Sequence, residues 1–146
     1  MPYNANSRKE TVVQYLAPTT NEDKIRKLKI LIAEDDDISE MLIDLTVKKF
    51  SKEIIKATTG IEAVETCRQN PDIDLVLMDI RMPEMDGYKA TRQIRKFNKD
   101  VVIIAQTAYG LTGYREKAIE AGCNDYISKP IKKEKLLGMI YNYFKE

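Results

Sequence analysis

The stretch IDLVLMDIRMPEMDG, residues 73–87, joins an apolar run, an acid and a turn. The run Leu75–Met78 is typical of a strand that is buried on both faces, as in parallel sheets. It ends at Asp79, after which Pro83 and the pair Asp86-Gly87 predict a turn. Open α/β sheets keep their chemistry at the carboxyl ends of their strands, so Asp79 is the first candidate for a working residue.

Short apolar runs alternate with helical patterns along the rest of the chain. Strands are predicted at residues 28–33, 53–58, 75–79, 101–108 and 124–128, and helices from residue 37, from residue 59 to 71, and at 88–97, 114–121 and 132–145. Because five strands alternate with five helices through short connections, we predict an α/β fold with a five-stranded parallel sheet and helices on both faces. The expected strand order is the flavodoxin-like 2-1-3-4-5.

Two of these helices have apolar residues at helical spacing, which are expected to face inward. They are Ile38, Met41, Leu42 and Leu45 in the first helix, and Ile61, Val64 and Cys67 in the second. Asp37, followed three residues later by Glu40, is expected to start the first helix as a capping box.

Length and composition predict one globular domain with an N-terminal extension. Of the 146 residues, 43% are hydrophobic and 32% charged, and the net charge of +1 favours neither nucleic acid nor an anionic membrane as a partner. Residues 1–26 are expected to be an extension or linker and residues 27–146 the domain. The absence of histidine from the sequence excludes histidine-based catalysis and histidine-ligated metal within this chain. Cys67 and Cys123 are expected to be reduced thiols of a cytoplasmic protein.

Parallel strands end at the same edge of a sheet, so the residues at their carboxyl ends are expected to converge. These residues are Glu34, Asp35, Asp79, Thr107 and Lys129. Carboxylates within ~4 Å of one another repel, so such a cluster must take up protons or bind a cation. Oxygen ligands without histidine or cysteine favour a hard ion, and we expect Mg²⁺, with Mn²⁺ as the alternative. Lys129 and the Thr107 hydroxyl suit an incoming phosphoryl group, which Asp79 would accept as an aspartyl phosphate.

Each of these residues also has an interpretation without function. Acids that follow a strand often cap the next helix, an interpretation that suits Asp36 and Asp37 better than Asp35. Taken singly, Thr107 and Lys129 are typical of solvated surface. The functional interpretation depends on the whole set falling at the same end of alternating strands.

Five markers, taken in order, give the chain from about Lys27 to Glu146 a resemblance to the receiver domains of two-component response regulators. They are the acidic pair in ILIAEDD, the segment LVLMDIRMPEMDG, the segment AQTA, the aromatic residue in NDYISKP, and the lysine–proline pair that ends it. The resemblance implies a CheY-like fold and a phosphorelay. In that relay Asp79 would accept a phosphoryl group from a phosphohistidine on a histidine kinase or a histidine phosphotransfer domain. Such a domain is a signalling module that assists its own phosphorylation and dephosphorylation, not an enzyme.

The resemblance also implies a ligand set for Mg²⁺. Asp35 and Asp79 would bind the ion directly, Glu34 through a water, and the backbone carbonyl of Arg81 would be a further ligand. Glu34 stands where most receiver domains have aspartate.

A switch is implied as well. Thr107 would turn toward the phosphoryl group while Tyr126 moves from an exposed to a buried position, although Tyr126 also fits an ordinary core aromatic residue. Lys129 would pair with the phosphoryl group, and the peptide bond before Pro130 would be cis. The responding surface, also a candidate homodimer interface, would comprise the elements at 114–121, 124–128 and 132–145.

The parent protein is expected to be a hybrid sensor kinase. The N-terminal PYN and the polar linker after it resemble the junction between a kinase ATP-binding domain and an attached receiver, and the motifs ILIAEDD and MPEMDG favour the same parent. The domain itself would make no membrane contact and would be cytoplasmic, where a membrane-bound parent could tether it. A free-standing regulator is the competing interpretation, since no DNA-binding domain follows Glu146 in this sequence.

Three other functions compete with a phosphorylation switch. A phosphatase of the haloacid dehalogenase type also uses an aspartate nucleophile with Mg²⁺, but it needs a second aspartate where Arg81 stands. A flavin or nucleotide binder needs a phosphate-cradling GxGxxG or GxxxxGK[ST] loop, and neither occurs in the sequence. A degenerate receiver that serves only as a docking module is disfavoured by the intact acids and lysine.

Overall fold

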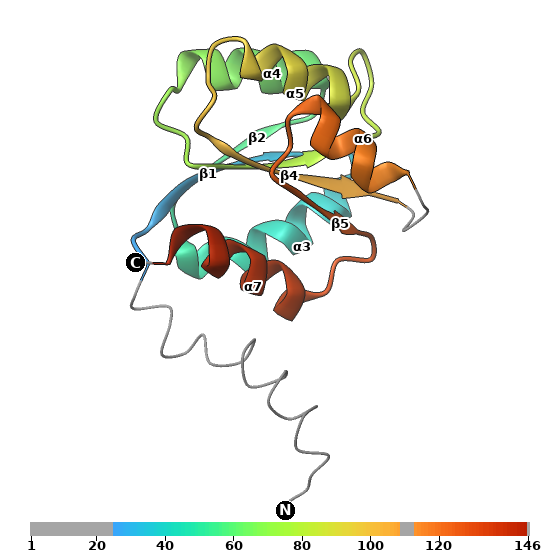
Figure 1. Ribbon diagram of the computed structural model, residues 1–146. Coiled ribbons are helices and arrows are strands. Elements are labelled where there is room, and N and C mark those ends of the chain that lie inside the picture. The colour runs from blue at the N-terminus through green and yellow to red at the C-terminus, as the bar shows by residue number, and fades with distance from the viewer. Residues whose placement is uncertain (1–24, 109–112, 146) are drawn as a thin grey trace, which may run out of the picture. The chain divides into compact units, whose positions relative to one another are not determined.

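The computed structural model describes residues 25–108 and 113–145 (Figure 1). Two compact units are present: residues 27–130 form one, and the last helix belongs to the other. The predicted extension, residues 1–26, lies almost entirely outside the described residues. Within the described ranges, none of the helices has the length and hydropathy that crossing a bilayer requires.

The larger unit is built on a parallel sheet of five strands. They are β1 (Leu28–Ala33), β2 (Ser51–Ala57), β3 (Leu75–Asp79), β4 (Val102–Thr107) and β5 (Asp125–Ser128). The order is β2-β1-β3-β4-β5 and every neighbouring pair is parallel. All residues of β1 and β3 are buried, as expected for strands covered on both faces. The predicted fold class and strand order are confirmed.

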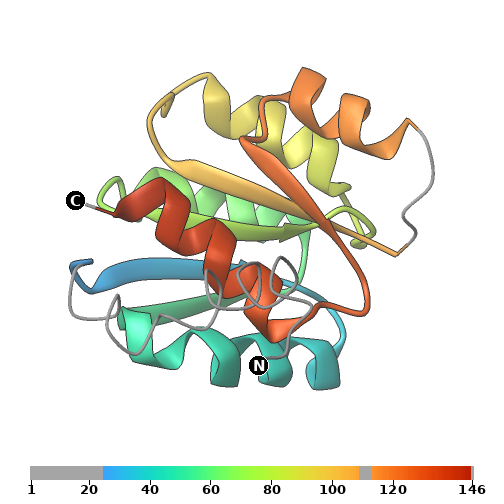
Figure 2. The ribbon, with the colours of Figure 1, turned by 60° about the horizontal axis from the view of Figure 1, so that its bottom comes forward.

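Helices connect the strands and cover both faces of this sheet. The larger unit contains α3 (Asp37–Val47), the 3-10 helix η2 (Lys48–Phe50), α4 (Gly60–Gln69), α5 (Gly87–Arg95) and α6 (Tyr114–Ala121). Helices α4 and α5 pack side by side on one face, and α3 lies on the other (Figures 1 and 2). In the smaller unit, α7 (Lys133–Phe144) has Leu136, Leu137 and Ile140 buried.

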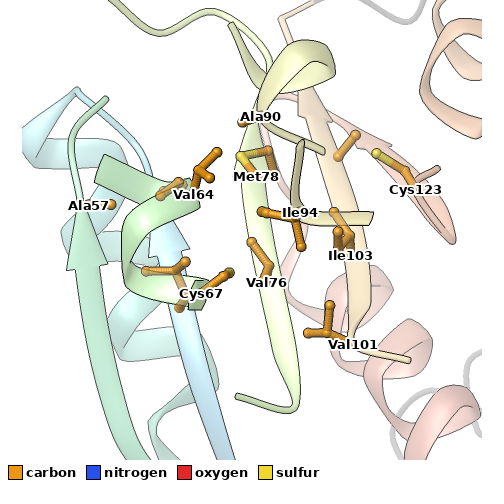
Figure 3. Packing of buried hydrophobic residues seen from close by; sticks show 14 of the residues in the cluster. Ala57, Val64, Cys67, Val76, Met78, Ala90, Ile94, Val101, Ile103 and Cys123 are labelled. Carbon is orange, nitrogen blue, oxygen red and sulfur yellow. The ribbon is translucent and has the colours of Figure 1, made fainter. Parts of the chain in front are cut away.

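The core between the sheet and the α4–α5 layer is close-packed and apolar. Val76 and Met78 of β3 and Ile103 of β4 point toward Val64 of α4 and Ile94 of α5 (Figure 3). Burial of a side chain of this size contributes about 1.5–3 kcal/mol, so this layer holds β3, and with it Asp79, in a fixed position.

The prediction that the apolar residues of the first helix face inward is wrong. Ile38, Met41, Leu42 and Leu45 are all between 52% and 65% exposed, whereas Ile43 and Val47 are buried. A charged contact with the neighbouring strand accompanies this orientation. Lys56 Nζ on β2 lies 2.7 Å from Glu40 Oε2 and 2.9 Å from Asp44 Oδ2, so the helix turns its Glu40–Asp44 side toward the sheet.

Two further expectations are corrected, one about the N-cap of α3 and one about the buried side of α4. The N-cap of α3 is Asp36 rather than Asp37, because the Asp36 carboxylate accepts the hydrogen bond from Ser39 N at 2.8 Å. In α4, Val64 and Cys67 are buried as predicted, but Ile61 is exposed. Gly60 instead faces the interior, where a Cβ atom would approach Met85 O to 1.9 Å.

Gly87, at the end of the quoted stretch, allows a close approach of two backbone segments. Its N–H donates to Ile80 O at 2.8 Å, and a Cβ at this position would lie 2.4 Å from Asp79 O and 2.9 Å from Ile80 Cα. Only glycine permits this contact without backbone movement, so Gly87 fixes the loop next to Asp79.

Replacing Gly87 with alanine should therefore destabilise the protein. We expect Gly87→Ala to lower the free energy of unfolding by about 1–3 kcal/mol, because the added methyl group meets backbone atoms that cannot give way cheaply. Urea denaturation measures this change, with Lys89→Ala on the exposed side of the same helix as the control. Equal stability of the Gly87→Ala variant and the wild type would contradict the close approach.

Candidate functional site

Four strand ends bring the predicted site residues to one edge of the sheet. Asp79 ends β3 and Thr107 ends β4, while Glu34 and Lys129 directly follow β1 and β5. The parallel registers carry these ends to similar levels. Residues that are up to 95 positions apart in the chain therefore share one site.

The acids form a compact cluster of oxygen atoms. Glu34, Asp35 and Asp79 each offer one carboxylate oxygen, and these oxygens all lie within 4.8 Å of one another. Glu34 and Asp79 are buried, with 2% and 4% exposure, whereas Asp35 is exposed. The cluster thus has a buried floor and one solvent-facing member.

Lys129 supplies positive charge to this site by contacting both buried acids. Its Nζ donates a hydrogen bond to Glu34 Oε1 at 3.0 Å and lies 3.4 Å from Asp79 Oδ1. A single ammonium group bridges two buried carboxylates, so the buried part of the site has more negative than positive charge when both acids are ionised.

Burial and the neighbouring charges shift the pKa values of both Asp79 and Lys129. Burial, followed by the negative charge of Glu34, raises the pKa of Asp79 to about 7. Burial alone would lower the pKa of Lys129, but its hydrogen bond to Glu34 and the attraction of Asp79 outweigh that effect and raise it. Lys129 therefore stays charged at neutral pH, while Asp79 is only partly ionised until another cation arrives.

The loop after β3 stays close to Asp79 at both of its ends. Arg81 N lies 3.4 Å from Asp79 Oδ1, a long contact, and the Arg81 side chain is exposed. Asp86 is the N-cap of α5 and accepts from Lys89 N at 2.9 Å. Arg81 is thus held beside Asp79 by the strand on one side and the capped helix on the other.

The β4 and β5 ends carry the other two predicted groups. Thr107 is 2% exposed, and its carbonyl accepts from Lys129 N at 2.7 Å. The Lys129–Pro130 peptide bond is cis. Tyr126 is half-buried and packs against the core cluster, a position compatible with both of its interpretations.

The donor set fits Mg²⁺. Three carboxylate oxygens lie close together, two of them on buried residues, and neither histidine nor cysteine is among the clustered ligands. Such oxygen-only sites suit Mg²⁺, which keeps several waters and uses one or two carboxylates. Burial and the negative charge of Glu34 raise the pKa of Asp79, and a bound cation would lower it again by favouring the ionised carboxylate.

Sequence reasoning missed Gln106 as a site residue. It pairs with Asp79 in the register of β3 and β4 and is 1% exposed. Neither its Oε1 nor its Nε2 has a hydrogen-bond partner among the residues that the structure describes. Leaving a buried polar group unpaired costs about 1–3 kcal/mol, so this position is unusual. A single polar residue inside the apolar strand VIIAQT was the available signal.

The comparisons with known proteins identify the family. A model described as the response regulator receiver domain matches residues 30–141. The chain belongs to the response regulator receiver family. This signalling domain is 34% identical over 130 residues to the signal transduction histidine-protein kinase BarA of Escherichia coli strain K12. The aligned region covers 88% of this chain and 14% of BarA. The receiver chain thus spans a small part of that relative's length.

Two solved structures of receiver domains resemble this one closely. The receiver domain of the sensor histidine kinase PA1611 from Pseudomonas aeruginosa, solved with a magnesium ion coordinated in its active-site cleft, is 35% identical. Its TM-score is 0.72 over 80% of this chain and 97% of that one. The co-crystal structure of the Saccharomyces cerevisiae phosphotransfer protein Ypd1 with the receiver domain of Ssk1 matches at 30% identity. Its TM-score is 0.76, with 82% and 90% of the two chains covered.

The raised pKa of Asp79 predicts how stability depends on pH. The unfolded carboxyl loses its proton near its ordinary pKa of 3.8, whereas the folded one keeps it until about 7. In that window the folded state binds more protons, so this group makes the free energy of unfolding fall as the pH rises. Asp79→Asn should remove that slope and stabilise the metal-free protein above about pH 7, by on the order of 2–4 kcal/mol.

Urea denaturation at a series of pH values, in the presence of a chelator, compares the wild type with this variant. The difference between their free energies of unfolding isolates Asp79 from the other acids. A difference that stays constant between about pH 4 and pH 7 would show that the Asp79 pKa is not raised.

Proposed function

We propose that this receiver domain accepts a phosphoryl group on Asp79 from a phosphohistidine. The observation that carries the proposal is the pairing of buried Asp79 with Lys129 inside an acidic cluster that fits Mg²⁺. An ionised carboxylate is a nucleophile, and the lysine and metal supply the positive charge that phosphoryl transfer requires.

The chain's own residues would each contribute to the transfer. An Asp79 carboxylate oxygen attacks phosphorus, a P–O bond forms, and the P–N bond to the donor imidazole breaks, with its electron pair returning to the imidazole nitrogen. Glu34, Asp35, Asp79 and the Arg81 carbonyl would hold Mg²⁺, with Mn²⁺ as a substitute. The ion would neutralise the oxygens of the phosphoryl group. Lys129 would exchange part of its pairing with Glu34 for a phosphoryl oxygen.

The same change of charge would drive the switch. The phosphoryl group brings roughly −1.5 to −2 charge units and three acceptor oxygens to the sheet edge, in place of the single negative charge of the ionised Asp79 carboxylate. Thr107 would donate its hydroxyl to one of these oxygens, and Tyr126 would follow it inward. We propose that α6, β5 and α7 each respond to this change, and that two copies of the domain associate through these elements.

We propose a histidine kinase or histidine phosphotransfer domain as the partner. The support is similarity to the kinases BarA and PA1611 and to the Ssk1 receiver crystallised with a phosphotransfer protein. Both kinases favour a hybrid sensor kinase as the parent protein. We further propose a cytoplasmic location, which suits the two free, buried thiols of Cys67 and Cys123.

The exposed apolar face of α3 is the proposed docking surface for that donor. Four large apolar side chains gather on this helix: Ile38, Met41, Leu42 and Leu45. The helix begins two residues after Asp35, so a partner that brings a histidine to Asp79 would pass over its first turns. An apolar helix face of this kind fits the side of a helical, histidine-bearing domain.

A direct test of phosphoacceptance uses small-molecule donors. The full chain is incubated with acetyl phosphate or phosphoramidate, with and without Mg²⁺, and its intact mass is measured. We expect the wild type to gain the mass of one phosphoryl group only with Mg²⁺, and Asp79→Asn to gain none, because the nucleophile is absent. Asp37→Asn changes an exposed acid outside the cluster and should be labelled like the wild type. A wild type that gains no mass would favour the docking module instead.

The docking surface has a separate test. Leu42→Glu and Leu45→Glu should each slow transfer from a phosphorylated histidine phosphotransfer domain that labels the wild type, by at least about 10-fold, because a charge would be buried in the interface. Labelling by acetyl phosphate should be unchanged. Ile61→Glu, which alters an exposed apolar residue of α4, is the matched control and should transfer normally. Transfer that is equally fast in all three variants would contradict docking on α3.

A further inference from the structure

Gln106 is a buried polar side chain without a visible function. Its side chain is 1% exposed, and both carboxamide atoms lack hydrogen-bond partners among the described residues. Native proteins pair nearly all such atoms, and each exception needs a reason. The reason we consider is a partner that Gln106 meets only when the neighbouring site is loaded.

The sheet places this carboxamide next to the Asp79 carboxyl. Asp79 and Gln106 are paired in the parallel register of β3 and β4. Paired residues on neighbouring strands point to the same face, and the strands lie ~4.8 Å apart. Met78 and Ala105, the preceding residues of each strand, belong to the core cluster (Met78 is labelled in Figure 3). The two polar side chains therefore share the opposite face, side by side.

We propose that Gln106 is a positioning residue of the phosphoacceptor site, and that its Nε2 donates a hydrogen bond to the Asp79 carboxyl when the acidic cluster holds its cation. The contacts of Asp79 with Lys129 and with Arg81 N both use Oδ1, so the proposal assigns the Gln106 hydrogen bond to Oδ2. The terminal torsion of a glutamine is soft, so the carboxamide can turn without moving β4. The bond would decide which carboxylate oxygen faces the cation and which attacks phosphorus.

This inference rests on the proposed function of Asp79, and it predicts a conflict between stability and metal binding. If Gln106 only fills space, an apolar side chain of the same length should do so better and change nothing else. If it orients Asp79, the same substitution should stabilise the metal-free fold and yet weaken the site, as loss of an outer partner does for other metal ligands.

Gln106→Met in the full chain separates these outcomes. Methionine is unbranched and of similar length, but it cannot donate a hydrogen bond. We expect its melting temperature without metal to rise, its Mg²⁺ affinity by calorimetry to fall about 10-fold, and its labelling by acetyl phosphate to slow. Ile104→Met, two residues earlier on the same face of β4 and also buried, is the matched control and should bind Mg²⁺ like the wild type.

Each result decides the matter. Wild-type Mg²⁺ affinity in Gln106→Met would overturn the positioning role, and so would a joint loss of stability and affinity, which indicates a packing role. A wild type that gains no phosphoryl adduct would instead overturn the proposed function of Asp79, whatever the variant shows.

Discussion

Two buried carboxylates that share one ammonium group determine the properties of this receiver domain. Glu34 and Asp79 are almost fully buried at the end of a parallel sheet, and Lys129 contacts both. Burial makes the ionised forms costly, and one lysine cannot offset two negative charges with Asp35 nearby. At neutral pH Asp79 is therefore only partly ionised, and a bound cation would favour its ionised form.

This balance depends on a rigid frame. β3 is buried along its whole length between β1 and β4, and the apolar layer beneath α4 and α5 fixes its position. The loop that follows is fixed at its end, because Gly87 N donates a hydrogen bond to Ile80 O and Asp86 caps the next helix. In the proposed switch, a charge added at Asp79 would therefore act on neighbours that are already in place, among them Lys129.

Much of this could be predicted from residues alone, because the relevant rules are local. Strand β1 and helix α6 have the bounds that their apolar runs and flanking turns predict, and the alternation of strands and helices led to the correct order. The positions of Glu34, Asp79, Thr107 and Lys129 followed from the same logic, since the ends of parallel strands meet at one edge.

What could not be predicted depends on contacts between distant segments. The periodicity of the first helix allows two inward faces, and the ion pairs from Lys56 to Glu40 and Asp44, made across to β2, accompany the less apolar one. A helical pattern shows that a stripe exists but not whether the protein or a partner covers it. Gln106 escaped notice for a related reason, because its neighbour Asp79 is defined only by the sheet register.

The central claim, that burial and the negative charge of Glu34 raise the pKa of Asp79, is tested most directly by the titration of Asp79 itself. Carbon-13 NMR of the aspartate carboxyl groups, with Asp79 assigned by comparison with Asp79→Asn, follows its protonation between about pH 3 and pH 9. The account predicts a midpoint near 7 without metal, and a midpoint shifted far toward the ordinary aspartate value when Mg²⁺ is present. A midpoint near 4 that Mg²⁺ does not alter would contradict it.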